Sequence, residues 1–245
     1  MKLEIYSLKK ILEEYYIAEI KKEHNIDESK INYENSSKIY VNEVLLTKKQ
    51  LKKIKTNAES VVNLWFATDF KCTLNPDVEY FLHKKSIELQ RKNASRTFLI
   101  LDEELNIHAY FTLAIHMFSN ELKDENKEAF LSNEKLKRLK SYDIYYCDKG
   151  EPDDDIEPDK KVFWSILIGQ LGRNDNSTKD IIDLKLLLKF IFSKIEEIKE
   201  LIGGNIVLLE AVKNEKLIAK YVEYNFEFLQ ELEEHYQLFV WNETY

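Results

Sequence analysis

The chain has 245 residues, of which 33% are charged and 44% are hydrophobic, and its formal net charge is −8 at pH 7. The charged fraction and the lack of a long apolar run exclude a membrane-spanning protein. Three prolines and five glycines exclude collagen-like and Pro/Gly-rich disordered classes. Nucleic acid is not favoured as a partner, because phosphate contacts require a basic surface.

The negative charge is unevenly distributed, and the cysteines are few. Residues 148–160 hold seven acids and two lysines. Cys72 and Cys147 have no CxxC spacing, which fits a reducing compartment and predicts no metal site. The first residues, Met1 to Glu4, lack the pattern of a signal peptide, so we expect a cytoplasmic protein.

Residues 1–60 have the pattern of a mostly helical, lysine-rich segment. Apolar residues at helical spacing predict a first helix with a stripe of Leu8, Ile11, Leu12, Tyr15 and Ile20. Thr47 is a suitable N-cap for a second helix from Lys48 to about Leu64. The stretch Lys38–Leu46 is ambiguous between strand and helix.

Residues 62–117 predict strands around one helix. Leu64–Ala67 is a short strand candidate. Asn75-Pro76-Asp77 indicates a helix start, with a capping side chain, proline at the first position and an acid near the helix dipole. Thr97–Leu101 and Ile107–Met117 are predicted to form a hairpin.

The pattern of residues 118–241 predicts an insertion followed by alternating strands and helices. Residues 118–160 are polar, with a short helix near Asn133–Leu139 and the acidic loop 148–160, and are interpreted as a surface insertion. The later elements are the strand Val162–Leu171, the helix Ile181–Ile198 ended by Gly203-Gly204, the strand Asn205–Val212, the helix Asn214–Tyr224, and the strands Phe226–Leu229 and Tyr236–Trp241. This order predicts an α/β or α+β fold with a mixed sheet.

One segment has the pattern of an anion-binding site. The strand Ser165–Leu171 runs into Gly172–Thr178 and then into a helix, where free N–H groups and the helix dipole favour a negative ligand. The segment has neither GxxxxGK[ST] nor GxGxxG, so neither a P-loop NTPase nor a dinucleotide enzyme is supported.

At this point the chain resembles the GNAT acyl-CoA N-acyltransferase family, and within it the toxin-like branch. The resemblance covers roughly residues 62–120 and 161–241. It is carried by the order and spacing of several motifs, namely Phe70-x-Cys72-x-x-Asn75-x-x-Val78-x-x-Phe81-Leu82, Ser95–Phe98, Ala109–Ala114, Ile168-Gly169-Gln170-Leu171-Gly172-Arg173, Leu208–Val212, Asn214 and Tyr221-x-x-x-Asn225-Phe226. It implies a mixed, mostly antiparallel central sheet flanked by helices. Residues 1–60 would then be an N-terminal helical extension, and residues 61–245 the acyltransferase domain with its insertion at about 118–160.

The resemblance also implies a reaction and a set of site residues. Acetyl-CoA would donate its acetyl group to an amine of a protein, a small molecule or an aminoacyl-tRNA, by direct attack on the thioester. The cofactor would contact Gln170, Leu171, Gly172 and Arg173, the loop residues Ser177, Thr178 and Lys179, and Asn214. Tyr221 would be the general acid. Glu210 is one candidate for the general base, and His116 and Asp175 are others.

Two departures from the family pattern leave alternatives open. The family places two glycines in its pyrophosphate loop, whereas residues 174–184 contain none, so a catalytically inactive interaction protein of the same fold is the second hypothesis. Asn225 replaces a glycine, which is a mild change because asparagine tolerates the left-handed conformation. Residues 1–60 could form a separate domain, a dimer arm or a docking surface for a protein partner. The lysine run 48–55 is interpreted as a solvated helix face, with an RNA-binding patch as the alternative.

Overall fold

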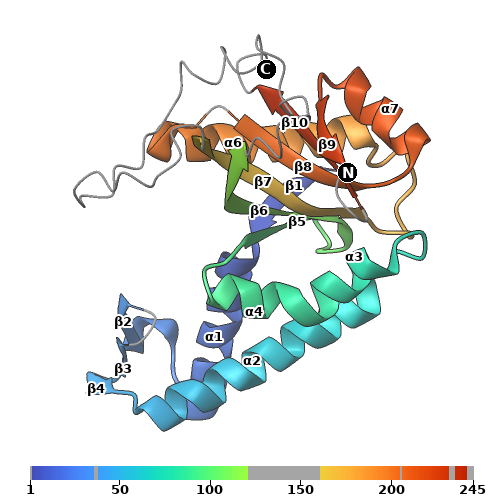
Figure 1. The fold of residues 1–245 in the computed structure, drawn as a ribbon. Coiled ribbons are helices and arrows are strands. Elements are labelled where there is room, and N and C mark those ends of the chain that lie inside the picture. The colour runs from blue at the N-terminus through green and yellow to red at the C-terminus, as the bar shows by residue number, and fades with distance from the viewer. Residues whose placement is uncertain (1, 36–37, 121–160, 205, 232–234, 242–245) are drawn as a thin grey trace, which may run out of the picture. The chain divides into compact units, whose positions relative to one another are not determined.

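The computed structural model describes residues 2–35, 38–120, 161–204, 206–231 and 235–241. Seven strands form one sheet in the order β1-β5-β6-β7-β8-β10-β9, and three more form a small sheet, β2-β3-β4 (Figure 1). The large sheet is mostly antiparallel, with a parallel pair between β7 and β8. This confirms the predicted fold class.

The chain divides into two compact units, described here one after the other. The N-terminal unit comprises residues 1–112 and 170–183, and the C-terminal unit comprises residues 113–169 and 184–245. Two strands contribute residues to both units, namely β6 (Ile107–Asn120) and β7 (Lys161–Arg173).

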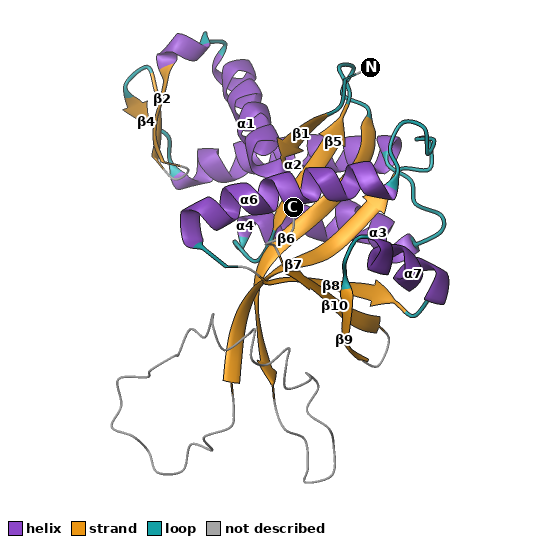
Figure 2. Ribbon diagram, turned by 90° about the horizontal axis from the view of Figure 1, so that it is seen from above, coloured by secondary structure: helices purple, strands orange, loops and turns teal. Residues whose placement is uncertain are grey.

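The N-terminal unit contains most of the helices. In chain order its elements are β1 (Glu4–Ser7), α1 (Leu8–His24), the short 3-10 helix η1 (Glu28–Lys30), β2 (Ile31–Asn35), β3 (Lys38–Val41), β4 (Val44–Leu45), α2 (Lys48–Asp69), α3 (Pro76–Tyr80), the π-helical turn η2 (Phe81–Lys85), α4 (Ser86–Arg91) and β5 (Arg96–Leu101). Figures 1 and 2 show β2, β3 and β4 beside the end of α1 and the beginning of α2.

Local sequence signals set the helix boundaries in this unit. The Ser7 side chain accepts a hydrogen bond from the Lys10 N–H at the start of α1. Thr47 and Gln50 form a reciprocal capping box at the start of α2, which confirms the predicted cap. Asn25 ends α1 in the left-handed conformation, with φ of 50°.

Two apolar clusters form the core of this unit. The larger one joins α1, α2 and the hairpin strands through residues that include Leu8, Leu12, Phe66, Leu99 and Tyr110. The smaller one packs the three-stranded sheet against the helices, through Ile20, Ile39, Val41, Leu46, Leu51 and Ile54. Burial of these side chains is the main force that holds the helices on the strands.

The C-terminal unit contains α6 (Leu184–Ile202), β8 (Ile206–Val212), α7 (Glu215–Glu223), β9 (Glu227–Glu231) and β10 (His235–Trp241). The apolar face of α6 is buried through Leu187, Leu188, Ile191, Phe192 and Ile195. Gly203 and Gly204 end the helix with φ of 74° and 101°, and the Gly203 N–H donates to the Lys199 carbonyl at 2.8 Å, which confirms the predicted glycine stop.

The structure corrects some of the predicted elements. The strand prediction for Leu64–Ala67 is wrong, because α2 continues to Asp69 and buries Val62, Phe66 and then Phe70 at a spacing of four. The ambiguous stretch 38–46 forms β3 and β4. The helix expected from Ile181 begins at Leu184, since the N–H groups of Ile181 and Ile182 both donate to the Thr178 carbonyl in a separate turn.

Other predicted elements are confirmed or lie outside the described residues. A helix begins at Pro76, although the Asn75 side chain makes no capping hydrogen bond. Asn225 adopts the left-handed conformation with φ of 64°. The short helix near Asn133–Leu139 and the acidic loop 148–160 fall outside the residues that the structure describes.

The division at residue 60 stays a prediction, and the structure adds two facts about it. Residue 60 lies within α2, and residues 1–112 belong to one compact unit. β1 pairs with β5 in the large sheet, from Glu4↔Leu101 to Ser7↔Phe98. In the part of the chain that the structure describes, no helix is both long and apolar enough to cross a membrane.

Candidate functional site

The backbone at the end of β7 has one edge that β8 does not pair. The parallel pairing of β7 with β8 runs from Ile166↔Val207 to Ile168↔Leu209, whereas β7 continues to Arg173. The Gln170 N–H donates to the Thr112 hydroxyl at 2.8 Å, and the Asn174 N–H donates to the His108 carbonyl at 2.9 Å, so both point toward β6. Because hydrogen-bonding groups alternate along a strand, those of Leu171 and Arg173 point to the opposite edge.

Asn174 fixes the loop that follows this strand. It is 2% exposed, and its Nδ2 donates to the carbonyls of Asp69 at 2.5 Å and Ile107 at 2.6 Å. Its Oδ1 accepts the N–H groups of Lys71 and Asn176, each at 3.2 Å. One amide therefore satisfies backbone groups from the end of α2, the start of β6 and its own loop.

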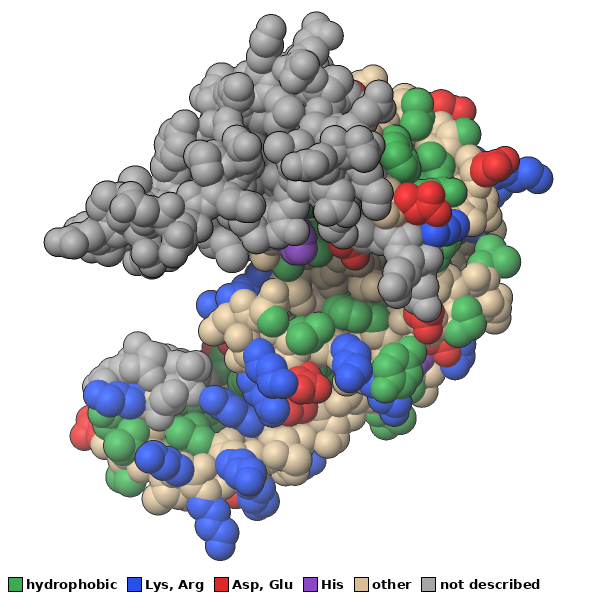
Figure 3. Space-filling view, in the orientation of Figure 1, with side chains coloured by type: hydrophobic (Ala, Val, Ile, Leu, Met, Phe, Trp, Pro, Cys, Tyr) green, Lys and Arg blue, Asp and Glu red, His purple; other side chains and the backbone are tan. Residues whose placement is uncertain are grey.

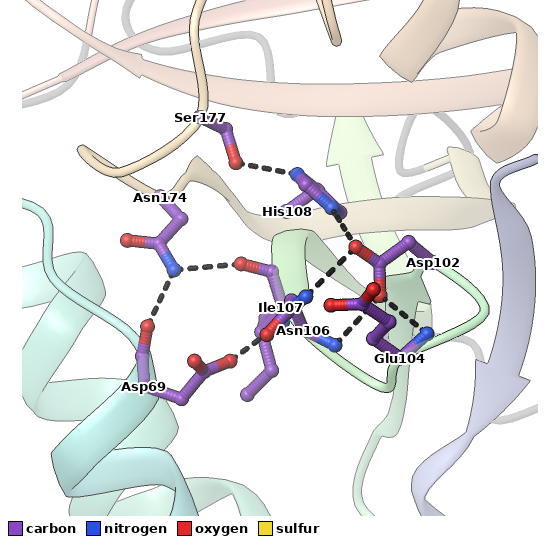
Figure 4. A network of polar contacts seen from close by, with 8 residues as sticks. All are labelled: Asp69, Asp102, Glu104, Asn106, Ile107, His108, Asn174 and Ser177. Atoms are coloured by element: carbon purple, nitrogen blue, oxygen red, sulfur yellow. Dashed lines mark hydrogen bonds and ion pairs between the residues drawn. The ribbon is translucent and has the colours of Figure 1, made fainter. Parts of the chain in front are cut away.

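A second buried chain of polar contacts ties the loop to the β5–β6 turn. The Ser177 hydroxyl lies 2.7 Å from His108 Nδ1, and His108 Nε2 lies 3.0 Å from Asp102 Oδ2 (Figure 4). Ser177, His108 and Asp102 are 3%, 7% and 9% exposed. His108 is thus a packed, hydrogen-bonded histidine.

The surroundings of Asp102 favour its ionised form. Burial raises the pKa of this carboxyl, but hydrogen bonds from Asn106, His108 and Glu104 outweigh burial and hold its pKa well below the usual value. Serine, histidine and aspartate in this order match a nucleophilic triad in type. All three are buried, and Asp102 also accepts backbone N–H groups of Glu104 and Asn106, so the set acts as a brace for the loop.

The predicted cofactor residues occupy different environments. Gln170, Leu171 and Arg173 are half-buried, and Thr178 and Lys179 are exposed. Gly172 is buried, and a Cβ atom there would lie 2.3 Å from Val78 Cγ1. Core packing is thus sufficient to explain this glycine. The Ser177 hydroxyl contacts His108, and its role in phosphate binding stays a prediction.

Two of the residues proposed as a general base also have structural contacts. The carboxylate of Asp175 accepts the Thr73 N–H at 2.8 Å, which holds the loop against the residues that follow α2. The carbonyl of His116 accepts a hydrogen bond from the Ser165 hydroxyl at 3.1 Å. Neither contact tests a catalytic role.

The other predicted site residues belong to the C-terminal unit. Tyr221 on α7 is 4% exposed, its ring packs edge-on to Phe226 at 5.6 Å, and burial raises its pKa to about 12. Glu210 is half-buried on β8, where Gln237 Nε2 donates to its carboxylate at 3.4 Å. Asn214 caps α7, since its side chain accepts the N–H groups of Lys216 and Leu217.

Sequence reasoning missed two features of the site. The bracing role of Asn174 and the pairing of Ser177 with His108 link residues 67 or more positions apart. The only sequence signal was a run of small polar residues after a buried strand. Among the described residues there is no group of three or more His, Cys, Asp or Glu side chains placed to hold a metal ion.

Comparisons with known proteins give structural neighbours only. No protein-family model matches the chain, and no curated protein matches it either. Among solved structures, the chain is similar to AtaT in complex with acetyl-methionyl-tRNAfMet, with 18% identity, a TM-score of 0.50, and coverage of 71% of this chain and 86% of that one. It is also similar to a tyrosine-to-phenylalanine mutant of KacT, with 15% identity, a TM-score of 0.52, and coverage of 74% and 92%.

These similarities establish the fold. AtaT and KacT are toxin acetyltransferases of GNAT fold, and the chain shares that fold over most of their length. The prediction of a GNAT-like fold is therefore confirmed.

Proposed function

We propose that the protein is an acetyl-CoA-dependent N-acetyltransferase that acts in the cytoplasm. Three observations support the proposal, namely the shared fold, the edge of β7 at Leu171 and Arg173 that has no strand partner among the described residues, and the buried side chain of Tyr221. The observation that carries it is Tyr221, because the fold alone does not determine a function.

Tyr221 differs from the other buried tyrosine whose pKa is clearly raised. Tyr110 donates a hydrogen bond from its hydroxyl to the Val78 carbonyl at 2.6 Å, so its proton already has an acceptor within the core. The Tyr221 hydroxyl has no hydrogen-bond partner among the described residues, although the side chain is 4% exposed. With a pKa of about 12 it stays protonated at neutral pH, and it would donate its proton to the CoA thiolate as that group leaves.

The cofactor would bind along the free edge of β7. Backbone N–H and C=O groups of Leu171 and Arg173 can pair with the amides of a pantetheine arm as a neighbouring strand would. Thr178 and Lys179 are exposed and can meet phosphate groups, whereas the Ser177 side chain cannot while it contacts His108. Acetyl-CoA supplies the activated acetyl group.

The acceptor is an amine of a protein, a small molecule or an aminoacyl-tRNA. The AtaT structure contains an acetylated methionyl-tRNA, which makes a charged tRNA one candidate. Glu210 is the proposed general base that would remove a proton from the acceptor ammonium, and its contact with Gln237 orients the carboxylate.

An interaction protein of the same fold is the second candidate function. Residues 174–184 contain no glycine, and two side chains of this loop, Asn174 and Ser177, are committed to internal hydrogen bonds. Under this alternative the chain would not turn over acetyl-CoA, and residues 1–60 would contact a protein partner or a second copy.

Calorimetric titration with acetyl-CoA, followed by kinetics of two variants, tests the proposal. We expect Tyr221→Phe to lower kcat by about 100-fold with little change in KM, since a general acid contributes roughly 10²–10⁴ in rate. Tyr110→Phe is the matched control and should reduce stability but leave kcat nearly unchanged. Failure to bind acetyl-CoA at millimolar concentration would reject the enzyme, and unchanged turnover of Tyr221→Phe would remove Tyr221 from the mechanism.

A further inference from the structure

A cavity of about 620 Å³ lies wholly within the N-terminal unit, and none of its lining residues is one assigned above to acetyl-CoA. Its lining comes from α1, α2, β3, the end of α4 and the start of β5. Figure 3 shows lysine and arginine side chains gathered over the part of the molecule that contains α2 and α4. The volume falls within the usual range for small-molecule sites.

Arg96 is a positively charged group held in place without a carboxylate partner. Its Nη1 donates to the carbonyls of Gln90 at 3.4 Å and Ser95 at 3.3 Å, and its Nη2 donates to Asn93 Oδ1 at 2.9 Å. These acceptors are neutral, and no ion pair of Arg96 is found among the described residues. The half-buried guanidinium is therefore fixed in position with its charge uncompensated, a state that an anionic ligand would stabilise.

Gln90 offers a second hydrogen-bond donor to the same cavity. The residue is 6% exposed and lines the cavity. Its Oε1 accepts the Thr97 N–H at 3.3 Å, but its Nε2 has no hydrogen-bond partner among the described residues. This Nε2 is not a fully buried atom, so it is available to an acceptor atom of a ligand in the cavity.

The other polar residues of the cavity largely neutralise one another. Lys9 lies 3.9 Å from Glu13, and Arg91 lies 3.3 Å from Glu59, a carboxylate that also accepts the Tyr16 hydroxyl. Arg91 and Arg96 are two of only four arginines in the chain. Arginine presents a planar fork of donors that suits phosphate better than the point charge of lysine does.

The rest of the lining is apolar or aromatic, with Leu12, Ile17 and Ile39 beside the Tyr16 ring. An inorganic anion would leave this surface uncovered. We propose that the cavity binds a nucleoside monophosphate group, with the phosphate on Arg96 and the base against the apolar lining near Gln90. A free nucleotide and the 5′ end of an RNA both offer this chemistry.

The experiment measures binding of adenosine 5′-monophosphate to the full chain by calorimetry, with and without saturating CoA. We expect AMP to bind in both conditions, and inorganic phosphate to bind at least about tenfold more weakly. Arg96→Gln should weaken AMP binding at least about tenfold, since a charged hydrogen-bond donor is lost. Lys92→Gln is the control, because Lys92 is an exposed neighbouring cation that pairs with Glu88 and does not line the cavity.

Three outcomes would overturn the proposal. They are no AMP binding, complete loss of AMP binding when CoA is present, or the same AMP affinity for Arg96→Gln as for the wild-type protein. Circular dichroism of Arg96→Gln shows whether the variant is folded, and Arg96→Lys should recover part of the affinity because it keeps the charge. A hexanucleotide RNA with and without a 5′ phosphate identifies the source. The site is assigned to an RNA end if the 5′-phosphorylated hexanucleotide binds more tightly than AMP, and if this binding requires the phosphate and is weakened by Arg96→Gln. If the hexanucleotide binds more weakly than AMP, the site is assigned to a free nucleotide.

Discussion

Two groups of polar side chains in the N-terminal unit contrast sharply in how they are satisfied. The brace formed by Asn174, Ser177, His108 and Asp102 is buried, and its members contact one another or nearby backbone groups. At the cavity, Arg96 keeps an uncompensated charge and Gln90 keeps an unpaired donor. Buried polar groups that are fully paired hold a fold together, whereas donors that face a cavity without a protein partner are available to a ligand.

The contrast revises the expectation for the loop after β7. The order of strand, loop and helix predicts an anion site in this loop, whereas no sequence pattern indicates the cavity. In the structure, Asn174 and Ser177 make internal contacts that hold the loop. The residues with spare donor capacity, Gln90 and Arg96, lie at the end of α4 and the start of β5. The comparison can be tested by removing one group at a time and measuring stability.

Asn174→Ala should have the largest effect. The substitution leaves two carbonyls and two N–H groups without their partner, and each buried unpaired group costs about 1–3 kcal/mol. Allowing for partial access of water, we expect a loss of about 4 kcal/mol in the free energy of unfolding, measured by urea denaturation. Asn176→Ala, in an exposed position of the same loop, should cost little. A loss below about 1 kcal/mol for Asn174→Ala would mean that the brace does not hold the loop.

Gly172→Ala should have the next largest effect, because the new Cβ would lie 2.3 Å from Val78 Cγ1. Overpacking of this kind costs typically about 1–3 kcal/mol. A double-mutant cycle with Val78→Ala separates packing from other causes, since the truncated partner makes room for the methyl group. Additive effects of the two substitutions would show that the glycine is required for another reason, such as contact with a ligand.

Whether a sequence-based prediction was correct depends on how far apart in the sequence the interacting residues lie. Signals within a few residues were reliable, as the Thr47 cap, the stop at Gly203 and the left-handed Asn225 show. The run Leu64–Ala67 was misassigned because a short apolar run fits a strand and a buried helix equally well, and only the packing of Phe66 and Phe70 decides.

The candidate site was predicted less completely, for a physical reason. Tyr221 and the end of β7 were found through the resemblance to a family. The partner of Ser177 is 69 residues away, and the oxygens that hold Arg96 come from a turn whose geometry no local pattern specifies. Only the folded chain shows which polar residues are occupied and which are available.

Asp102→Asn should have a smaller effect that depends on pH. The pKa of the native carboxyl is below its value in the unfolded chain, so its ionised form stabilises the fold above about pH 4, and this contribution is lost as the pH falls. We therefore expect the free energy of unfolding of the wild-type protein to exceed that of the variant by about 2 kcal/mol at pH 7 and by clearly less at pH 3. Urea denaturation at both pH values measures this difference. A gap that is constant with pH would show that the ionised carboxylate is not what stabilises the turn.

Arg96→Gln should have the smallest effect on the free protein, within about 0.5 kcal/mol of zero. The side chain loses hydrogen bonds to three neutral oxygens, but a half-buried charge without a carboxylate partner is also removed, and the two effects oppose each other. With AMP at 100 times its dissociation constant, the free energy of unfolding of the wild-type protein should rise by about 2.7 kcal/mol. That of the variant should rise much less at the same AMP concentration. A large loss in the free energy of unfolding of the ligand-free variant would instead show that the fold itself requires Arg96, as it requires the residues of the brace.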